Sequence, residues 1–184
     1  MTDARAVLMV IDVQNGFVND RSAVAVPVIA DVVRRWRAGG GDVMFTRFHN
    51  YPDSPYERLI GWRRLTTSPE TDLIPEIMPY VDDTTPIVDK NVYTAFTREG
   101  EQLVRDNGWT DLYLCGIDTD NCVLKTAVDA FERDLTPWII EDASASTGGQ
   151  LAHHAGLLVA RRFIGSGQII NSTSLPITSI PVVQ

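Results

Sequence analysis

Three side chains that could act together in covalent catalysis each come just after a short apolar run: Asp12, Lys90 and Cys122. A carboxylate can take the proton of a thiol, and an ammonium group can stabilise the charges that develop on both. These residue types therefore supply what a covalent mechanism with a thiol nucleophile requires. We predict that they form one catalytic site, with Cys122 as the nucleophile.

Each of these residues also has a plain structural interpretation. Cys122 could be a small buried hydrophobic residue, as Cys115 inside an apolar run is expected to be. Asp12 could cap the turn that follows it, and Lys90 could be a solvated lysine at the end of a strand. The convergence of all three favours the catalytic interpretation, because no single position does so alone.

Cys122 stands where a helix is expected to begin. Residues 118–121 have the composition of a helix start, and the helical spacing of apolar residues begins at Val123. A thiol in the first helical turn lies near unpaired backbone N–H groups and the positive end of the helix dipole. These lower the pKa of a thiol and can hold an oxyanion, so we expect an activated Cys122.

The elements that must position these residues follow from an alternation of apolar runs and amphipathic stretches. Apolar runs that indicate buried parallel strands lie at residues 6–11, 43–45, 87–88, 112–117, 138–140 and 168–170. Helical spacing covers residues 24–38, 97–107, 121–133 and 150–163, and Thr147 with Gln150 forms a capping-box pattern before the last of these. The alternation predicts an α/β fold with three αβα layers and a doubly wound, mainly parallel, Rossmann-like sheet of about six strands. In such a sheet ligands bind at the carboxyl ends of the strands, where the three catalytic candidates lie.

The chain has 184 residues, which suits a single domain spanning 1–184. Residues 49–85 are an insertion rich in proline and aromatic residues, which we expect to be a lid or a substrate wall, with a short helix or an oligomer contact as the alternative. Residues from about 172 form a C-terminal extension, which we expect to pack on the body or on a neighbouring subunit. These two surfaces favour a homo-oligomer, a dimer or larger.

The composition excludes several classes of partner. The formal net charge of −8 opposes binding to nucleic acid. No apolar run approaches the roughly 18 residues of a membrane span, and the first residues do not resemble a signal peptide. Two cysteines, Cys115 and Cys122, fit free thiols in the cytoplasm. We therefore expect a cytoplasmic protein with a small-molecule substrate and no nucleic-acid or membrane partner.

Three segments carry a resemblance to a known family: VLMVIDVQNGF, which ends at Phe17, PIVDKNVYTAF at 86–96, and LCGIDTDNCVLKTAVDAFERDLTPWIIEDASAS at 114–146. Together they resemble the isochorismatase-like cysteine hydrolases, which include nicotinamidases, carbamoyl-amide hydrolases and isochorismatases. The resemblance places the family's catalytic Asp, Lys and Cys on Asp12, Lys90 and Cys122. It also implies a cis peptide bond before Asp118, between Ile117 and Asp118, with the backbone N–H groups of Asp118 and Cys122 as the oxyanion hole.

The chain departs from this family in two places. Many relatives carry a small apolar residue where Asp118 stands, and a carboxylate that pointed at the thiol would raise the pKa of Cys122. Nicotinamidase-like members hold a metal through an Asp and several His after the second strand, whereas this chain has His49 as the single histidine of its first 150 residues. The pair of His49 and Asp53 is too weak to indicate a site, so we predict no metal and no cofactor.

The residues and the resemblance together predict hydrolysis of the C–N bond of a small carboxamide or carbamoyl compound through a thioester intermediate. The alternatives are a vinyl-ether hydrolase of the isochorismatase type, for which the resemblance implies a dispensable thiol, and a catalytically silent small-molecule-binding member. Nucleotide binding is disfavoured because the chain lacks the glycine-rich loop. Five aromatic residues are predicted as substrate-binding walls at the same edge, with core packing as the equal alternative: Phe17, Phe48, Trp62, Tyr93 and Phe96.

Overall fold

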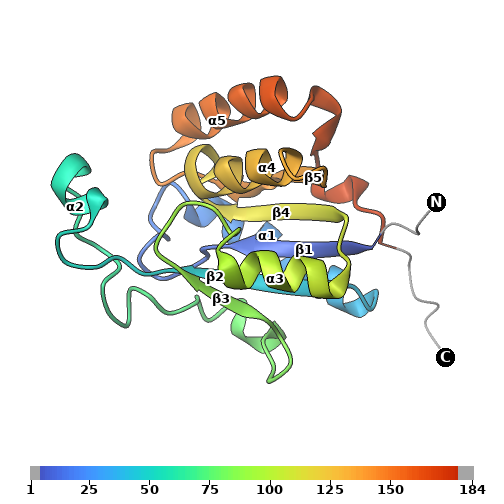
Figure 1. Ribbon diagram of the computed structural model, residues 1–184, viewed down its shortest axis with the longest axis horizontal. Coiled ribbons are helices and arrows are strands. Elements are labelled where there is room, and N and C mark those ends of the chain that lie inside the picture. The colour runs from blue at the N-terminus through green and yellow to red at the C-terminus, as the bar shows by residue number, and fades with distance from the viewer. Residues whose placement is uncertain (1–4, 178–184) are drawn as a thin grey trace.

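A sheet of six parallel strands forms the centre of the molecule (Figure 1) in the computed structural model, which describes residues 5–177. The strands occur in the order β3-β2-β1-β4-β5-β6. They are β1 (Ala6–Ile11), β2 (Asp42–Phe48), β3 (Ile87–Lys90), β4 (Asp111–Ile117), β5 (Thr136–Ala145) and β6 (Ile169–Ile170). The predicted α/β fold with a doubly wound sheet of about six strands is confirmed, and every strand pair is parallel.

Helices cover both faces of this sheet and complete the three layers. They are α1 (Val26–Ala38), α2 (Pro55–Ile60), α3 (Arg98–Asn107), α4 (Leu124–Phe131) and α5 (Gln150–Phe163). α1 packs on one face, whereas α3, α4 and α5 pack on the other; in Figure 1, α3 lies in front of the sheet and α1 behind it. Within residues 5–177 no helix combines the length and the apolar character needed to cross a membrane.

The side chains of β1 alternate between the two cores, because successive residues of a strand point to opposite faces. Leu8 and Val10 join the cluster under α1, and Met9 and Ile11 join the cluster under the other three helices. All four are completely buried. A strand covered on both faces is apolar along its whole length. The apolar run therefore ends with the strand at Ile11, and the polar residue Asp12 follows.

The start of α5 differs from the capping-box prediction. The helix begins at Gln150, with Gly149 at its N-cap position and no side chain capping it. Thr147 was predicted to cap this helix, but its hydroxyl and its backbone N–H donate instead to the carboxylate of Asp118. Thr147 thus binds a buried carboxylate from a distant part of the chain, and the helix begins at Gln150 without a side-chain cap.

The insertion at 49–85 contains a packed part and an exposed part. Ile74 and Ile77 are buried in the core cluster under α1. The short helix α2 buries none of its residues and projects beside the carboxyl ends of the strands (Figure 1). Apart from α2 and a single turn at Met78–Tyr80, the insertion is irregular.

The C-terminal extension packs on the body where it begins. Ser172 donates to the Asp142 carboxylate through its backbone N–H at 2.7 Å and its hydroxyl at 2.6 Å. The carbonyl oxygen of Ser172 accepts a hydrogen bond from Arg35 at 3.2 Å. The rest of the predicted extension, residues 178–184, lies outside the described residues.

Gly116 allows β1 and β4 to pair next to the catalytic candidates, where it is in register with Ile11. A Cβ atom on Gly116 would lie 2.1 Å from the carbonyl oxygen of Ile11. Gly116 also has a φ of 123°, in the region that favours glycine. Glycine is therefore required at this position to keep Asp12 beside the chain that leads to Cys122.

Gly116→Ala is expected to lower the free energy of unfolding by about 2 to 6 kcal/mol, because it adds backbone strain and a clash. Gly40→Ala is the matched control, since Gly40 has a φ of +74° but nothing within 4 Å of an added Cβ. In Gly40→Ala, backbone strain alone is expected to lower the free energy of unfolding by about 1 to 2 kcal/mol. Urea denaturation followed by circular dichroism measures both variants, and equal losses would show that the contact with Ile11 is unimportant.

Candidate active site

Asp12 and Cys122 lie where the order of the strands reverses, and the side chain of Lys90 reaches Asp12 from the edge strand β3. β1 and β4 are neighbours at the centre of the sheet, and the chain leaves them toward opposite edges. Asp12 directly follows β1, Lys90 ends β3, and Cys122 lies in the wide helical turn Thr119–Val123 after β4. An open α/β sheet forms its ligand crevice at this point. The structure thus brings together the three residues singled out in the sequence.

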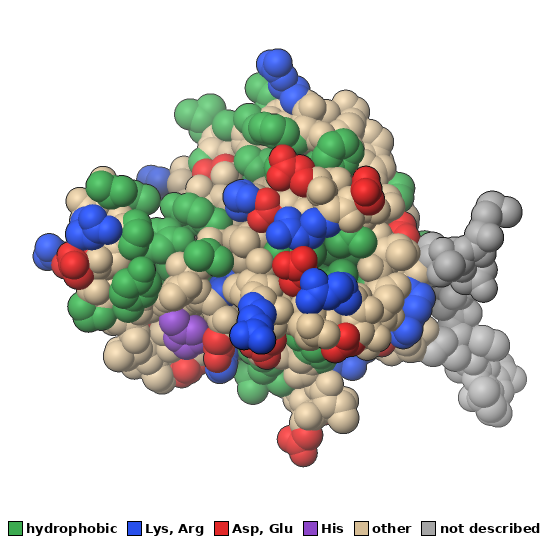
Figure 2. Space-filling model, in the orientation of Figure 1, with side chains coloured by type: hydrophobic (Ala, Val, Ile, Leu, Met, Phe, Trp, Pro, Cys, Tyr) green, Lys and Arg blue, Asp and Glu red, His purple; other side chains and the backbone are tan. Residues whose placement is uncertain are grey.

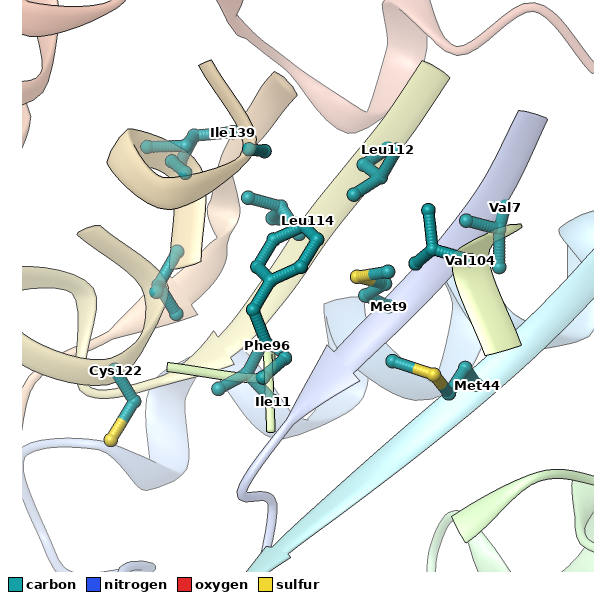
Figure 3. Close-up of a cluster of buried hydrophobic side chains, with 14 of the residues drawn as sticks. Val7, Met9, Ile11, Met44, Phe96, Val104, Leu112, Leu114, Cys122 and Ile139 are labelled. Carbon is teal, nitrogen blue, oxygen red and sulfur yellow. The ribbon is translucent and has the colours of Figure 1, made fainter. Parts of the chain in front are cut away.

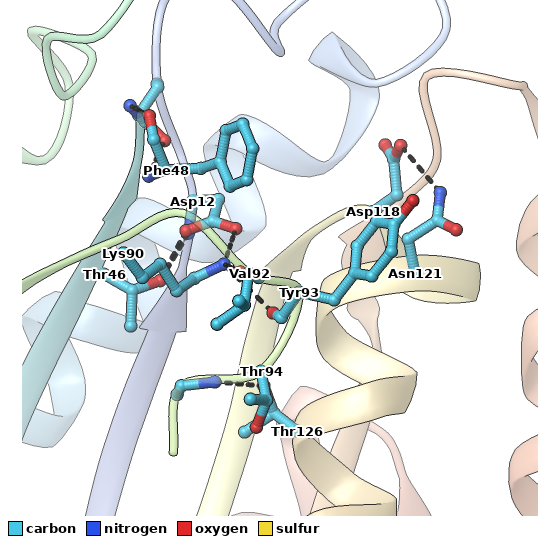
Figure 4. A network of polar contacts seen from close by, with 12 residues as sticks. Asp12, Thr46, Phe48, Lys90, Val92, Tyr93, Thr94, Asp118, Asn121 and Thr126 are labelled. Carbon is cyan, nitrogen blue, oxygen red and sulfur yellow. Dashed lines mark hydrogen bonds and ion pairs between the residues drawn. The ribbon is translucent and has the colours of Figure 1, made fainter. Parts of the chain in front are cut away.

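Asp12 and Lys90 form a completely buried ion pair (Figure 4). Lys90 Nζ lies 2.6 Å from Asp12 Oδ2, and each side chain is 0% exposed. Lys90 Nζ also donates to the carbonyl oxygens of Val92 and Tyr93, both at 3.0 Å, and Thr46 donates its hydroxyl to Asp12 Oδ1 at 2.6 Å. Burial acts to lower the pKa of Lys90, but the Asp12 carboxylate and the neighbouring Cys122 together outweigh burial and raise this pKa overall. The ammonium group is therefore held in its charged form.

Cys122 is 4% exposed and lies at the edge of the apolar cluster under α3, α4 and α5 (Figure 3). Burial raises the pKa of its thiol well above the usual value, while the charge of Lys90 acts to lower it and that of Asp12 to raise it further. The prediction of a lowered pKa is wrong for the resting protein, because desolvation and the neighbouring carboxylate outweigh the helix start. The resting site combines a neutral thiol with an ionised carboxylate and ammonium pair.

Asp118 follows β4, and the peptide bond between Ile117 and Asp118 is cis. Its carboxylate accepts hydrogen bonds from the Thr147 N–H at 2.6 Å, the Thr147 hydroxyl at 2.8 Å and Asn121 Nδ2 at 3.4 Å. In Figure 4 it points toward Asn121 and away from the ion pair. Burial raises the pKa of Asp118, although the hydrogen bonds from Thr147 act to lower it. The charge of Asp118 in turn raises the pKa of Cys122.

A cavity of about 370 Å³ opens in front of Cys122, with Asp118, Asn121 and Thr147 among its lining residues. Four of the five aromatic residues proposed as substrate walls line it: Phe17, Phe48, Trp62 and Tyr93. The rings of Phe17 and Trp62 stack at an interplanar angle of 11° with their centroids 5.8 Å apart. The volume lies at the small end of the range for ligand sites, which suits a compound of about one ring.

Phe96 does not line the cavity, so its predicted role as a substrate wall is wrong. Its ring lies in the core cluster, where Figure 3 shows it among Ile11 and Leu114. The guanidinium group of Arg133 lies 4.7 Å from the centroid of the ring. After β3 the chain passes close to α4. The N–H of Ala95, the residue before Phe96, donates to the hydroxyl of Thr126 on α4.

Several residues that line the cavity are not predicted from the sequence, among them Tyr56, Ile60 and Arg64 of the insertion. The Tyr56 ring packs edge-on against Phe48, with centroids 5.0 Å apart, and against Tyr93, with centroids 5.2 Å apart. Burial raises the pKa of Tyr56, so its hydroxyl stays protonated. Its place in a segment already expected to form a substrate wall was the one signal that could have identified it.

The residues present do not fit the metal site of nicotinamidase-like proteins. His49 Nε2 lies 3.1 Å from the Asp89 carboxylate, which also pairs with Arg47 at 2.7 Å. Asp53 pairs with Arg58 at 3.6 Å. In the part of the chain that the structure describes, no group of three or more His, Cys, Asp or Glu side chains is placed to hold a metal ion. His49 and Asp53 thus have separate partners, Asp89 and Arg58.

Comparisons with known proteins agree with the resemblance seen in the sequence. The Isochorismatase domain family matches residues 6–168. Nicotinamidase 3 of Arabidopsis thaliana is 31% identical over 163 residues, covering 83% of this chain and 79% of that protein. The ureidoacrylate amidohydrolase RutB of Pantoea ananatis is 28% identical over 201 residues, covering 89% of this chain and 78% of that protein.

Solved structures share the fold across almost the whole chain. The crystal structure of N-carbamoylsarcosine amidase from Thermoplasma acidophilum superposes with a TM-score of 0.78 at 24% identity, covering 94% of this chain and 99% of that one. At this identity the likeness shows the fold alone. The family match, which spans most of the sequence, goes further, and with the plant relative it shows that this chain belongs to the isochorismatase family of hydrolases.

Proposed function

We propose that this protein hydrolyses the C–N bond of a small carboxamide or carbamoyl compound through a thioester on Cys122. The observation that carries the proposal is the buried Asp12–Lys90 ion pair next to the Cys122 thiol at the wall of the cavity. A proton acceptor, a cation and a nucleophile in one enclosed site are what this reaction needs. The names of the relatives, a nicotinamidase and an amidohydrolase, support it.

In the first half of the reaction, Cys122 Sγ attacks the carbonyl carbon while its proton passes to the Asp12 carboxylate. A C–S bond forms, and the carbonyl oxygen becomes an oxyanion that the backbone N–H groups of Asp118 and Cys122 hold. The C=O bond then forms again as the C–N bond breaks. Asp12 gives its proton to the leaving nitrogen, which departs as ammonia or an amine, and Lys90 stays protonated throughout.

In the second half, water attacks the thioester carbon while Asp12 takes one of its protons. The resulting oxyanion collapses, and the C–S bond breaks. Asp12 then returns the proton to the sulfur of Cys122, which restores the neutral thiol. The products are a carboxylic or carbamic acid and the ammonia or amine released earlier.

The walls of the cavity favour a substrate with a flat or apolar part. The stacked rings of Phe17 and Trp62 offer a broad apolar face, and Phe48, Tyr56 and Tyr93 line the same space. Aromatic faces bind flat groups well because dispersion and desolvation both favour the contact. We propose that the amide points toward Cys122 while the rest of the substrate contacts these rings.

Cys122→Ala is expected to lower kcat by at least about 100-fold, because the nucleophile is lost. Ammonia release from a panel of small carboxamides and carbamoyl compounds measures this. Cys115→Ala is the matched control, since Cys115 is 0% exposed inside β4 and does not line the cavity. It should lower thermal stability and leave turnover largely intact.

Three outcomes of this assay contradict the proposal. Cys122→Ala that retains more than a tenth of the wild-type turnover excludes the thioester. Release of pyruvate from an enolpyruvyl ether, without ammonia or amine from any amide, favours the vinyl-ether alternative. Tight binding of panel compounds without turnover favours a catalytically silent binding protein.

Lys90→Met is expected to lower the free energy of unfolding by about 3 to 5 kcal/mol, because it leaves the Asp12 carboxylate buried without its counter-charge. The raised pKa of Lys90 means that the contribution of the pair is complete at pH 7 and is lost only as the pH rises through that raised value. Adding Asp12→Asn to Lys90→Met should recover most of the stability but no activity. Chemical denaturation at pH 7 tests this, and no recovery in the double variant would contradict it.

The predicted homo-oligomer stays a proposal, which exposed apolar side chains on α4 and α5 support. Figure 2 shows hydrophobic side chains gathered over these two helices. The most exposed are Phe131 (51%), Leu151 (85%), Leu158 (63%) and Phe163 (55%). A second copy of the chain would bury them.

Sedimentation velocity at micromolar concentration is expected to show a dimer or a larger assembly. Leu158→Glu should shift the protein toward the monomer, because it places a charge within the apolar contact. A wild-type protein that sediments only as a monomer would contradict the proposal.

A further inference from the structure

The side chain of Asp118 joins two loops of the active site. Its three hydrogen bonds run to Thr147, in the loop between β5 and α5, and to Asn121, the residue before Cys122. No local pattern requires a carboxylate here, and Asp118 itself is buried to 7% exposure. The carboxylate therefore acts as a clamp between the loop after β5 and the turn that carries the thiol.

The backbone of Asp118 is also fixed on one side. Its carbonyl oxygen accepts hydrogen bonds from the N–H groups of Asn121 at 3.2 Å and Val123 at 3.1 Å, which shape the turn around Cys122. Among residues 5–177 its own N–H has no backbone partner. A buried N–H without a protein partner is satisfied by an acceptor that enters the cavity, either water or a ligand oxygen. The carboxylate and the carbonyl oxygen of Asp118 both accept hydrogen bonds from the protein. Its N–H is the polar group of this residue that remains for a ligand.

The far end of the clamp is itself anchored. The carbonyl oxygen of Thr147 accepts a hydrogen bond from Asn19 Nδ2 at 3.4 Å, which comes from the loop after β1. Thr119, in the turn that carries Cys122, contacts His153 of α5 through its hydroxyl at 2.8 Å. Hydrogen bonds therefore link the loops after β1, β4 and β5, and Thr147 is held by Asn19 as well as by Asp118.

We propose that the Asp118 side chain is a positioning residue, which through Thr147 and Asn121 holds the backbone N–H of Asp118 in line with the reacting carbonyl oxygen. The inference rests on the proposed function for the role of that N–H. A donor placed in advance stabilises the transition state without reorganisation, and a displacement of about 1 Å is enough to lower the rate about 100-fold.

The Asp118 carboxylate has two effects that can be separated by experiment. Its charge disfavours ionisation of the Cys122 thiol, whereas its hydrogen bonds hold the loop and the turn together. The negative charge of Asp118 raises the pKa of the Cys122 thiol, and a small apolar residue would avoid this. Only the hydrogen bonds favour a carboxylate here. Asp118→Asn keeps the two hydrogen bonds to Thr147, because the amide oxygen can accept from the Thr147 N–H and the amide nitrogen can donate to the Thr147 hydroxyl. It loses only the 3.4 Å hydrogen bond that Asn121 Nδ2 donates to Oδ2. It removes the charge and retains the clamp.

The test compares Asp118→Ala with Asp118→Asn in the full chain. Asp118→Ala is expected to lower kcat on an amide substrate about 10- to 100-fold with little change in KM, because the N–H acts in the transition state. Asp118→Asn should recover most of kcat and should lower the pH midpoint for alkylation of Cys122 by iodoacetamide. Equal kcat values in the two variants, or a wild-type kcat in Asp118→Ala, would overturn the proposal.

Amide hydrogen exchange at Thr147 distinguishes positioning from simple bracing of the loop. Faster exchange in Asp118→Ala together with the loss of kcat supports the proposal, whereas faster exchange at unchanged kcat overturns it. If Asp118→Ala does not fold, Thr147→Val takes its place, since it removes only the hydroxyl donor. It should lower kcat about 3- to 10-fold, and Thr147→Ser should restore it; no loss in Thr147→Val would then count against the clamp.

A wild-type protein that turns over no amide would contradict the proposed function and leave the clamp open to a separate measurement. The probe is then p-nitrophenyl acetate, whose acetyl group transfers to Cys122 Sγ with release of p-nitrophenolate. This acylation passes through an oxyanion at the same N–H. Slower acylation of Asp118→Ala than of Asp118→Asn supports positioning, and equal rates overturn it.

Discussion

The Asp12–Lys90 ion pair is the interaction on which the site depends, because two buried charges are tolerated only when both are fully compensated. Lys90 donates hydrogen bonds from its ammonium group to Asp12 and to two backbone carbonyl oxygens just after β3. The hydroxyl of Thr46 donates to the other carboxylate oxygen of Asp12. These partners come from β1, β2 and β3, which are adjacent in the sheet. The strand order and the parallel register are therefore requirements of the site.

Two parts of the chain, the sheet and the insertion, form different parts of the cavity. The sheet supplies the reactive end, where Asp12, Lys90 and Cys122 meet at the carboxyl edge of the strands. The insertion supplies Tyr56 and Trp62, which pack with rings from the body and form the apolar wall. A rigid reactive end and a wall built from a separate segment allow one chemistry to serve different substrates, since the wall can change without moving the ion pair.

The fold and the reactive residues could be predicted because both depend on short-range patterns. Apolar runs identify the strands, and a parallel sheet brings the residues after them to one edge whatever the loops between them do. The outcome for Phe96 could not be predicted in this way. Phe96 and Tyr93 lie three positions apart with similar rings, and only the path of the chain after β3 places one in the core and the other at the cavity.

Competition between distant residues limited the other predictions. Thr147 satisfies a local capping pattern, but the carboxylate of Asp118, 29 positions earlier, takes both of its donors. The thiol of Cys122 stands at a helix start, which lowers a pKa, but the residues that bury it come from several other elements and raise the pKa instead. Propensity and dipole are read from neighbours in the sequence, whereas desolvation depends on the whole tertiary structure.

The raised pKa of Cys122 is compatible with the proposed thiol nucleophile because the proposed mechanism does not release its proton to solvent. Ionisation to solvent would add a negative charge to a site that already holds Asp12 and Asp118, and burial makes such a charge unfavourable. Transfer of the same proton to Asp12 leaves the total charge of the site unchanged, because the thiol gains the negative charge that the carboxylate loses. Lys90 remains beside the pair before and after the transfer. A site that keeps its net charge constant avoids most of the desolvation penalty, and it can therefore hold the thiol neutral at rest and still use it as a thiolate.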